Sequence, residues 1–72
     1  MMYTPKQQRR HIAKLQRGWA ASAFRDQKYN LHRAHIEQKK GNRLLAGAYR
    51  MEALWDRQWG NRRLRIARKN LR

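Results

Sequence analysis

The fold of this 72-residue chain is decided in residues 41–54, which read GNRLLAGAYRMEAL. Gly41 can adopt a positive φ without a Cβ penalty, so it suits the end of one helix. Asn42 is a residue type that suits the cap of the next helix. The stretch therefore predicts a helical hairpin with its turn at Gly41. One face of the second helix is expected at positions that recur at helical spacing: Leu44, Ala48, Met51 and Trp55.

The segment before this stretch is expected to be helical. Thr4-Pro5 is a strong start signal, because threonine supplies a capping oxygen and proline loses no needed hydrogen bond at the first helical position. A packing face is predicted from the apolar residues Ile12, Leu15, Trp19 and Ala23. The opposite side is predicted to carry a cationic stripe: Lys6, Arg10, Lys14, Arg17, Arg25 and Lys28. One long helix from Pro5 to Lys40 and two helices broken near Asp26 or Asn30 both fit this pattern.

A second glycine–asparagine pair, Gly60-Asn61, repeats the chemistry of Gly41-Asn42. It predicts the end of the second helix and the start of a third one. The expected layout is a single small all-α domain over residues 1–72, either a helical hairpin or a three-to-four-helix domain. Its parts are a basic N-terminal helix at about 5–25, a hairpin at about 29–58 and a basic C-terminal helix at about 62–71. Much of the core of so small a domain is expected to come from three residues: Trp19, Trp55 and Trp59.

The charge is large and unevenly spread. The formal net charge is +15, from 19 Lys and Arg against four Asp and Glu. All four acids lie in the middle of the chain, so residues 1–25 and 57–72 form two acid-free basic arms. Such an excess favours a polyanionic partner. Exposed helix faces normally mix both signs, so the two arms indicate binding rather than mere solvation.

Several residues follow, in order, the pattern of small single-hairpin bacterial and phage regulators of the ANR and PerC type. The matching positions span about residues 29–68: Tyr29, Ala34, Glu37, Gly41, Asn42, Ala46, Tyr49, Ala53, Trp59 and Arg62. The chain resembles this family, whose hairpin is similar to one tetratricopeptide unit. The resemblance implies an all-α transcriptional regulator of bacterial or phage origin. It also implies that the hairpin binds another protein, because ANR members are thought to act on AraC-type activators.

The composition disfavours several other classes of protein. The chain has no cysteine, which excludes disulfides and thiolate zinc sites. His32 and His35 lack a third ligand at suitable spacing, so no metal site is expected. No paired acid and base, nucleophile or phosphate loop is present, so neither an enzyme nor a cofactor is predicted. No apolar run approaches the roughly 18 residues of a membrane span, and a cytoplasmic location is expected.

The leading hypothesis is a small regulatory protein that binds DNA or RNA mainly through phosphate contacts. The predicted contact residues come from both arms: Lys6, Arg10, Lys14, Arg17, Arg25, Lys28, Arg62, Arg63, Arg65, Arg68, Lys69 and Arg72. One alternative is a module that docks a transcription regulator through Ala46, Ala48 and Trp59. Another is a basic structural protein of a ribosome or virion. We expect a homodimer or a lasting complex with a partner, because the apolar stripe exceeds what one short chain can cover. The sequence leaves open the choice between DNA and RNA and between activation and repression.

Overall fold

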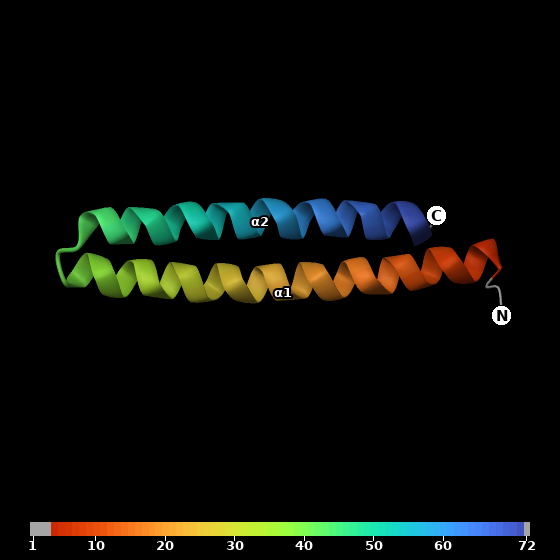
Figure 1. Cartoon of the computed structure of the whole chain (residues 1–72), viewed down its shortest axis with the longest axis horizontal. Coiled ribbons are helices and arrows are strands. Elements are labelled where there is room, and N and C mark those ends of the chain that lie inside the picture. Colours follow the sequence, from red (N-terminus) through yellow and green to blue (C-terminus); the bar gives the residue numbers. More distant parts are fainter. Residues whose placement is uncertain (1–3, 72) are drawn as a thin grey trace.

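Two long helices make up the described part of the chain. The computed structural model describes residues 4–71, which form α1 (Pro5–Lys39) and α2 (Arg43–Leu71). The helices lie antiparallel and side by side in a hairpin that measures 56 × 18 × 12 Å (Figure 1). The predicted all-α class and the helical hairpin are confirmed. Of the two alternatives for the first helix, the structure has the single long one.

Local chemistry explains where α1 begins. The backbone N–H of Gln7 donates to the Thr4 hydroxyl (3.2 Å), and the backbone N–H of Thr4 donates to the side-chain oxygen of Gln7 (2.9 Å). This reciprocal pair is a capping box, and Pro5 occupies the first helical position. The predicted start of the helix at Thr4-Pro5 is confirmed.

The turn between the helices depends on Gly41, whose φ is +84°. The N–H of Gly41 donates to the carbonyl of Gln38 (3.1 Å), and the N–H of Asn42 donates to the carbonyl of Glu37 (2.9 Å). This pair of bonds is the Schellman motif, in which glycine adopts the left-handed conformation. The predicted turn at Gly41 is confirmed. The side chain of Asn42 acts differently from the expected cap, because its Nδ2 donates to the carboxylate of Glu37 (2.7 Å).

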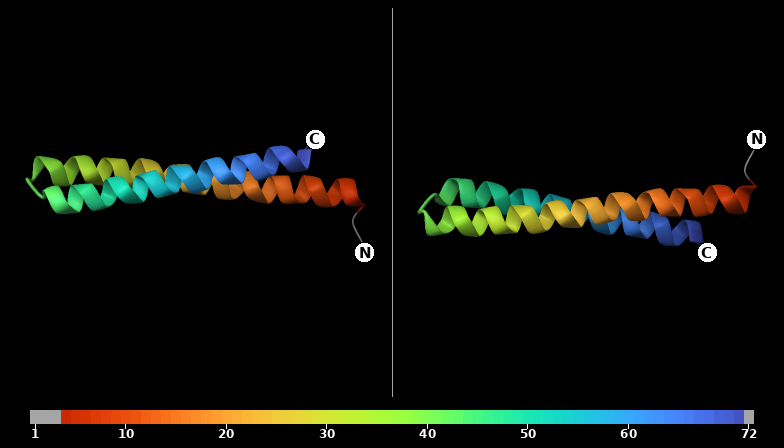
Figure 2. Two further views of the ribbon diagram at one scale, coloured as in Figure 1. Left: turned by 90° about the horizontal axis from the view of Figure 1, so that it is seen from above. Right: turned by 90° about the horizontal axis from the view of Figure 1, so that it is seen from below.

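The helices meet along what we call the contact line, a set of residues spaced alternately by three and four. Every member is buried or half-buried. A strict seven-residue repeat of this kind makes two helices wind around each other, and Figure 2 shows them crossing. The line consists of Ala13, Gln16, Ala20, Ala23, Gln27, Asn30, Ala34 and Glu37 on α1, and of Ala46, Tyr49, Ala53, Asp56, Gly60, Arg63, Ala67 and Asn70 on α2.

Small residues dominate the centre of this line. The buried apolar residues are all alanines, at 1–2% exposure, and no large side chain of the described residues is fully buried. On α2 the smallest residues recur every seventh position: Ala46, Ala53, Gly60 and Ala67. Side chains this small let the two backbones approach closely. The same packing leaves most of the larger apolar side chains exposed, outside the interface between the helices.

Polar residues on the contact line find partners across the interface. Asn30 Nδ2 donates to Asp56 Oδ2 (2.8 Å), and Arg63 Nη1 donates to Gln16 Oε1 (3.3 Å). Each bond joins residues far apart in sequence, and the satisfied groups avoid the cost of burying an unpaired polar atom. We infer that these pairs fix how the two helices align.

The predicted third helix is wrong, because α2 runs without a break through Gly60-Asn61 to Leu71. Gly60 is not a helix stop but a close contact. A Cβ added to it would lie 2.7 Å from Cε1 and Cζ of Phe24 on the other helix. The predicted division into residues 5–25, 29–58 and 62–71 is therefore replaced by one hairpin over residues 5–71.

Both predicted packing faces are also wrong, except at Ala23, which is half-buried on the contact line. Ile12, Leu15 and Trp19 are 40–50% exposed, since α1 packs through Ala13, Gln16 and Ala20 instead. The expected face of α2 points outward as well: Leu44, Ala48, Met51 and Trp55 are all exposed. Nor do the three tryptophans form the core. The physical reason is the same in each case, since alanine and glycine allow a closer helix contact than large side chains do.

Candidate nucleic-acid interface

The contact line divides the rest of each helix into two flanks and, between them, an outer edge that lies opposite the contact line. Each residue advances about 100° around the helix axis, because an α-helix has 3.6 residues per turn. Every second member of the contact line, one in each seven-residue repeat, serves as a reference position. On α1 the reference positions are 13, 20, 27 and 34, and on α2 they are 46, 53, 60 and 67. A residue one or four places after a reference position lies on one flank. A residue one place before it, or two places after it, lies on the other flank.

Contacts between the helices show which flanks share a side of the hairpin. Arg50 donates a hydrogen bond to the side-chain oxygen of Gln38. Both residues lie four places after a reference position, so both belong to the first kind of flank. The guanidinium of Arg63 lies 5.0 Å from the centre of the Trp19 ring and 5.3 Å from that of Trp59, and both tryptophans belong to the second kind. Flanks of the same kind therefore adjoin, and the hairpin has two broad sides.

The first of these, which we call the basic side, carries eight cations and, among residues 4–71, no acid. All eight are exposed, and in the described part of the chain none forms an ion pair with Asp or Glu. The hairpin brings the two basic arms side by side here, although they lie at opposite ends of the sequence (Figure 1). The eight are Arg10, Lys14, Arg17, Lys28, Arg43, Arg50, Arg57 and Arg68.

Three members of the basic side were missed by sequence reasoning. Arg43 and Arg50 lie in the nearly balanced segment that holds the acids, whereas Arg57 lies at the start of the C-terminal arm but is not among the predicted contact residues. Their spacing of seven residues places them in one row along α2. The signal was therefore present in the sequence, and reading it required the position of the contact line.

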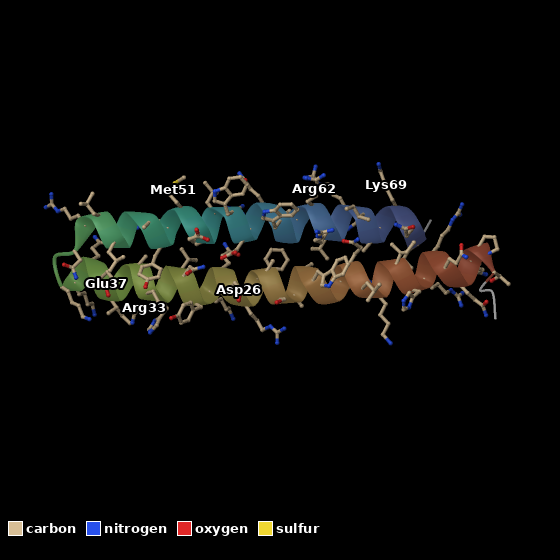
Figure 3. The ribbon with its side chains drawn as sticks, viewed as in Figure 1. Asp26, Arg33, Glu37, Met51, Arg62 and Lys69 are labelled. Atoms are coloured by element: carbon tan, nitrogen blue, oxygen red, sulfur yellow. The ribbon has the colours of Figure 1, made fainter. Side chains whose placement is uncertain are left out.

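The other predicted contact residues are scattered. Arg25 and Arg65 lie on the outer edges of the two helices, opposite the contact line. Arg62 and Lys69 belong to the second side and project from α2 away from α1 (Figure 3). Arg72 lies outside the described residues. The structure thus brings together five of the twelve predicted residues on the basic side: Arg10, Lys14, Arg17, Lys28 and Arg68.

Arg63 is poorly placed for phosphate contact. Its side chain is half-buried on the contact line, where it donates to Gln16 (3.3 Å) and lies against two tryptophan rings. A guanidinium in this position is held by cation–π and hydrogen-bond interactions. Arg63 therefore stabilises the hairpin. This corrects the prediction that Arg63 is a surface residue that binds phosphate.

Lys6 lies at the open end of the hairpin. It lines a hollow of about 550 Å³ together with Arg9 and Arg10 from α1 and with Asn70 and Leu71 from α2. Three cations around one hollow extend positive charge beyond the end of α2. The hollow adjoins Arg10, so it continues the basic side.

The second broad side, which we call the aromatic side, holds most of the exposed large apolar residues. It carries two acids, Asp26 and Glu52, and three cations, Arg33, Arg62 and Lys69, so its charge is nearly balanced. Arg62 lies 5.5 Å from the centre of the Trp59 ring. Among residues 4–71, seven of the twelve exposed large apolar residues lie here: Ile12, Leu15, Trp19, Tyr29, Leu45, Trp55 and Trp59.

The three residues predicted to bind a protein partner end up in different places. Ala46 is 1% exposed on the contact line, so in the folded hairpin it packs against α1, and its prediction as a surface docking residue is wrong. Ala48 is exposed on the aromatic side. Trp59 is 43% exposed there, and it is the least exposed of the three tryptophans.

The acidic residue near the turn, Glu37, forms hydrogen bonds and ion pairs within the hairpin. Glu37 is 3% exposed, accepts from Asn42 and Arg33, and lies 3.9 Å from the ammonium of Lys40. Arg33 also lies over the ring of Tyr49. Its interaction with the Tyr49 side chain is the main reason that the pKa of Arg33 is raised above its ordinary value. Arg33 therefore stays charged and holds the turn end of the hairpin.

Two other kinds of site are absent from the described residues. No three of their His, Asp or Glu side chains are grouped in a way that could hold a metal ion. Neither helix, over residues 4–71, has a stretch apolar enough to span a membrane. The chain matched no family model, no curated protein and no solved structure.

Proposed function

We propose that this chain is a small helical regulatory protein that binds nucleic acid along its basic side. The observation that supports the proposal is that the two arms, the second of which includes Arg57, converge with Arg43 and Arg50 on one acid-free surface. Lysine and arginine side chains in such a row can contact successive phosphates and release condensed counterions. Arginine dominates the row, and its planar guanidinium can donate two hydrogen bonds to one phosphate.

The contacts are expected to be with phosphates rather than with base edges. The hairpin is 56 Å long, which corresponds to roughly 16 base-pair steps at about 3.4 Å each. Its basic side is two helices wide, whereas a protein that reads the major groove inserts a single helix into the groove. Phosphate contacts give affinity and position, with little sequence discrimination. A regulatory effect on transcription would then come from occupying DNA or RNA.

Binding by the unmodified protein is expected to fall steeply as salt rises. Six to eight phosphate contacts on a duplex predict that the logarithm of the binding constant falls with the logarithm of the salt concentration with a slope of roughly −5 to −7. This log–log slope corresponds to a loss of about 10³ to 10⁴ in affinity between 50 and 200 mM salt. The measurement is a fluorescence-anisotropy titration of 16-base-pair DNA, 16-base-pair RNA and a single strand of the same length. Two duplexes of different sequence should bind within a few-fold of each other. No binding to any of the three at 50 mM salt would refute the proposal.

A further inference from the structure

The aromatic side lacks a partner within the hairpin. The interface between the helices buries alanines, so it removes little apolar surface from water, and the larger apolar residues remain 40–61% exposed on the aromatic side. Large contiguous apolar patches on the surface of soluble proteins mark interaction sites. A chain of 72 residues with so small a core is short of stabilising burial.

We propose that the aromatic side is the interface with a second copy of this chain, so that two hairpins pack face to face as a four-helix bundle. The nearly balanced charge is the first argument. Asp26 and Glu52 offset two of the three cations on this side. Two copies with a net charge of +15 each can meet here without opposing their basic sides. Those sides then face outward, on opposite surfaces of the bundle.

The size of the surface is the second argument. The broad side of a hairpin of 56 × 18 Å covers roughly 1,000 Å², and a stable interface of standard size buries about 800 Å² on each partner. Between Trp55 and Trp59 lies a shallow groove of about 120 Å³, lined also by Gln58 and Arg62. It offers a place for an apolar side chain of the second copy.

Two other occupants fit this side less well. Nucleic acid would meet the carboxylates of Asp26 and Glu52, and arginine guanidiniums already face two of the four rings on this side, those of Trp19 and Trp59. Base stacking needs a free aromatic face. An acidic protein would be drawn to the acid-free basic side instead. A second copy needs neither a free ring face nor a charge of one sign.

The test is sedimentation equilibrium at moderate salt, together with tryptophan emission in a dilution series. The unmodified protein is expected to sediment as a dimer whose emission shifts to longer wavelength as dilution separates the copies. The double variant Leu15→Glu/Trp55→Glu is expected to sediment as a monomer. Its added carboxylates lower the net charge, so a lost dimer cannot be ascribed to greater repulsion between copies.

Leu31→Glu/Leu54→Glu is the matched control. Leu31 and Leu54 are 48% and 46% exposed and lie on the basic side, so this variant is expected to remain dimeric. Circular dichroism shows whether each variant is still helical, and the dilution series of the unmodified protein stands independently of both. A monomer at every concentration would overturn the proposal. So would a dimer that only the control variant disrupts, or tryptophan emission that responds to an oligonucleotide but not to dilution.

Discussion

Replacing Arg43, Arg50, Arg57 and Arg68 with glutamine is expected to weaken duplex binding on the order of a hundredfold or more at 50 mM salt. All four are exposed on the basic side. Each lost phosphate contact flattens the log–log salt slope by about 0.9, so four losses flatten it by up to about 3.6. Glutamine keeps helix propensity, so the hairpin should still form. Anisotropy titrations across a salt series measure both quantities, and circular dichroism checks the helices.

A matched variant separates the position of the charge from its amount. Replacing Arg25, Lys39, Arg65 and Lys69 with glutamine also removes four positive charges, but none of these residues lies on the basic side. This variant is expected to lose much less affinity and to keep most of the salt slope. Equal losses in the two variants would mean that net charge alone, rather than one surface of the hairpin, carries the binding.

The second large effect concerns the packing of the hairpin. Gly60→Leu is expected to destabilise the protein by about 1–3 kcal/mol or more, because overpacking forces side chains and backbone apart. Even the first carbon of a side chain at Gly60 would lie 2.7 Å from the ring of Phe24. Thermal melting at a fixed protein concentration measures the change, since self-association would make the melting temperature depend on concentration.

Gly18→Leu provides the control for this prediction. A Cβ at Gly18 meets nothing within 4 Å, and leucine gains up to about 1 kcal/mol over glycine in a helix interior. This variant is expected to melt at the same or a higher temperature. If Gly60→Leu behaved in the same way, the close contact between Gly60 and Phe24 would not hold the helices together.

Sequence reasoning succeeded where local chemistry decides the structure. The capping box at Thr4 and the positive φ of Gly41 depend on a few neighbouring residues, so both ends of α1 could be predicted. It failed at Gly60, because glycine has the same local signature at a helix end as at a tight contact. At Gly41 a Schellman motif forms and α1 ends. At Gly60 the helix α2 continues, and the ring of Phe24 occupies the space that a side chain would otherwise fill.

The candidate site shows the same limit. The two basic arms were visible in the sequence, but the side on which each cation lies depends on the face through which the helix packs. Helical periodicity favoured the large residues Ile12, Leu15 and Trp19 as that face, whereas the helices approach each other through Ala13 and Ala20. A shift of one residue rotates the helix by about 100°. On α1 that rotation places Arg25 on the outer edge of the helix rather than on the basic side.

The central claim is that the two sides of the hairpin have different roles, and NMR shift mapping tests it most directly. A 16-base-pair duplex would be titrated into the isotopically labelled protein. We expect the backbone signals around Arg17, Arg50 and Arg57 to move, while the indole N–H signals of Trp19, Trp55 and Trp59 stay in place. The contradictory result is the reverse pattern, in which the three indole signals shift strongly and the signals along the basic side do not.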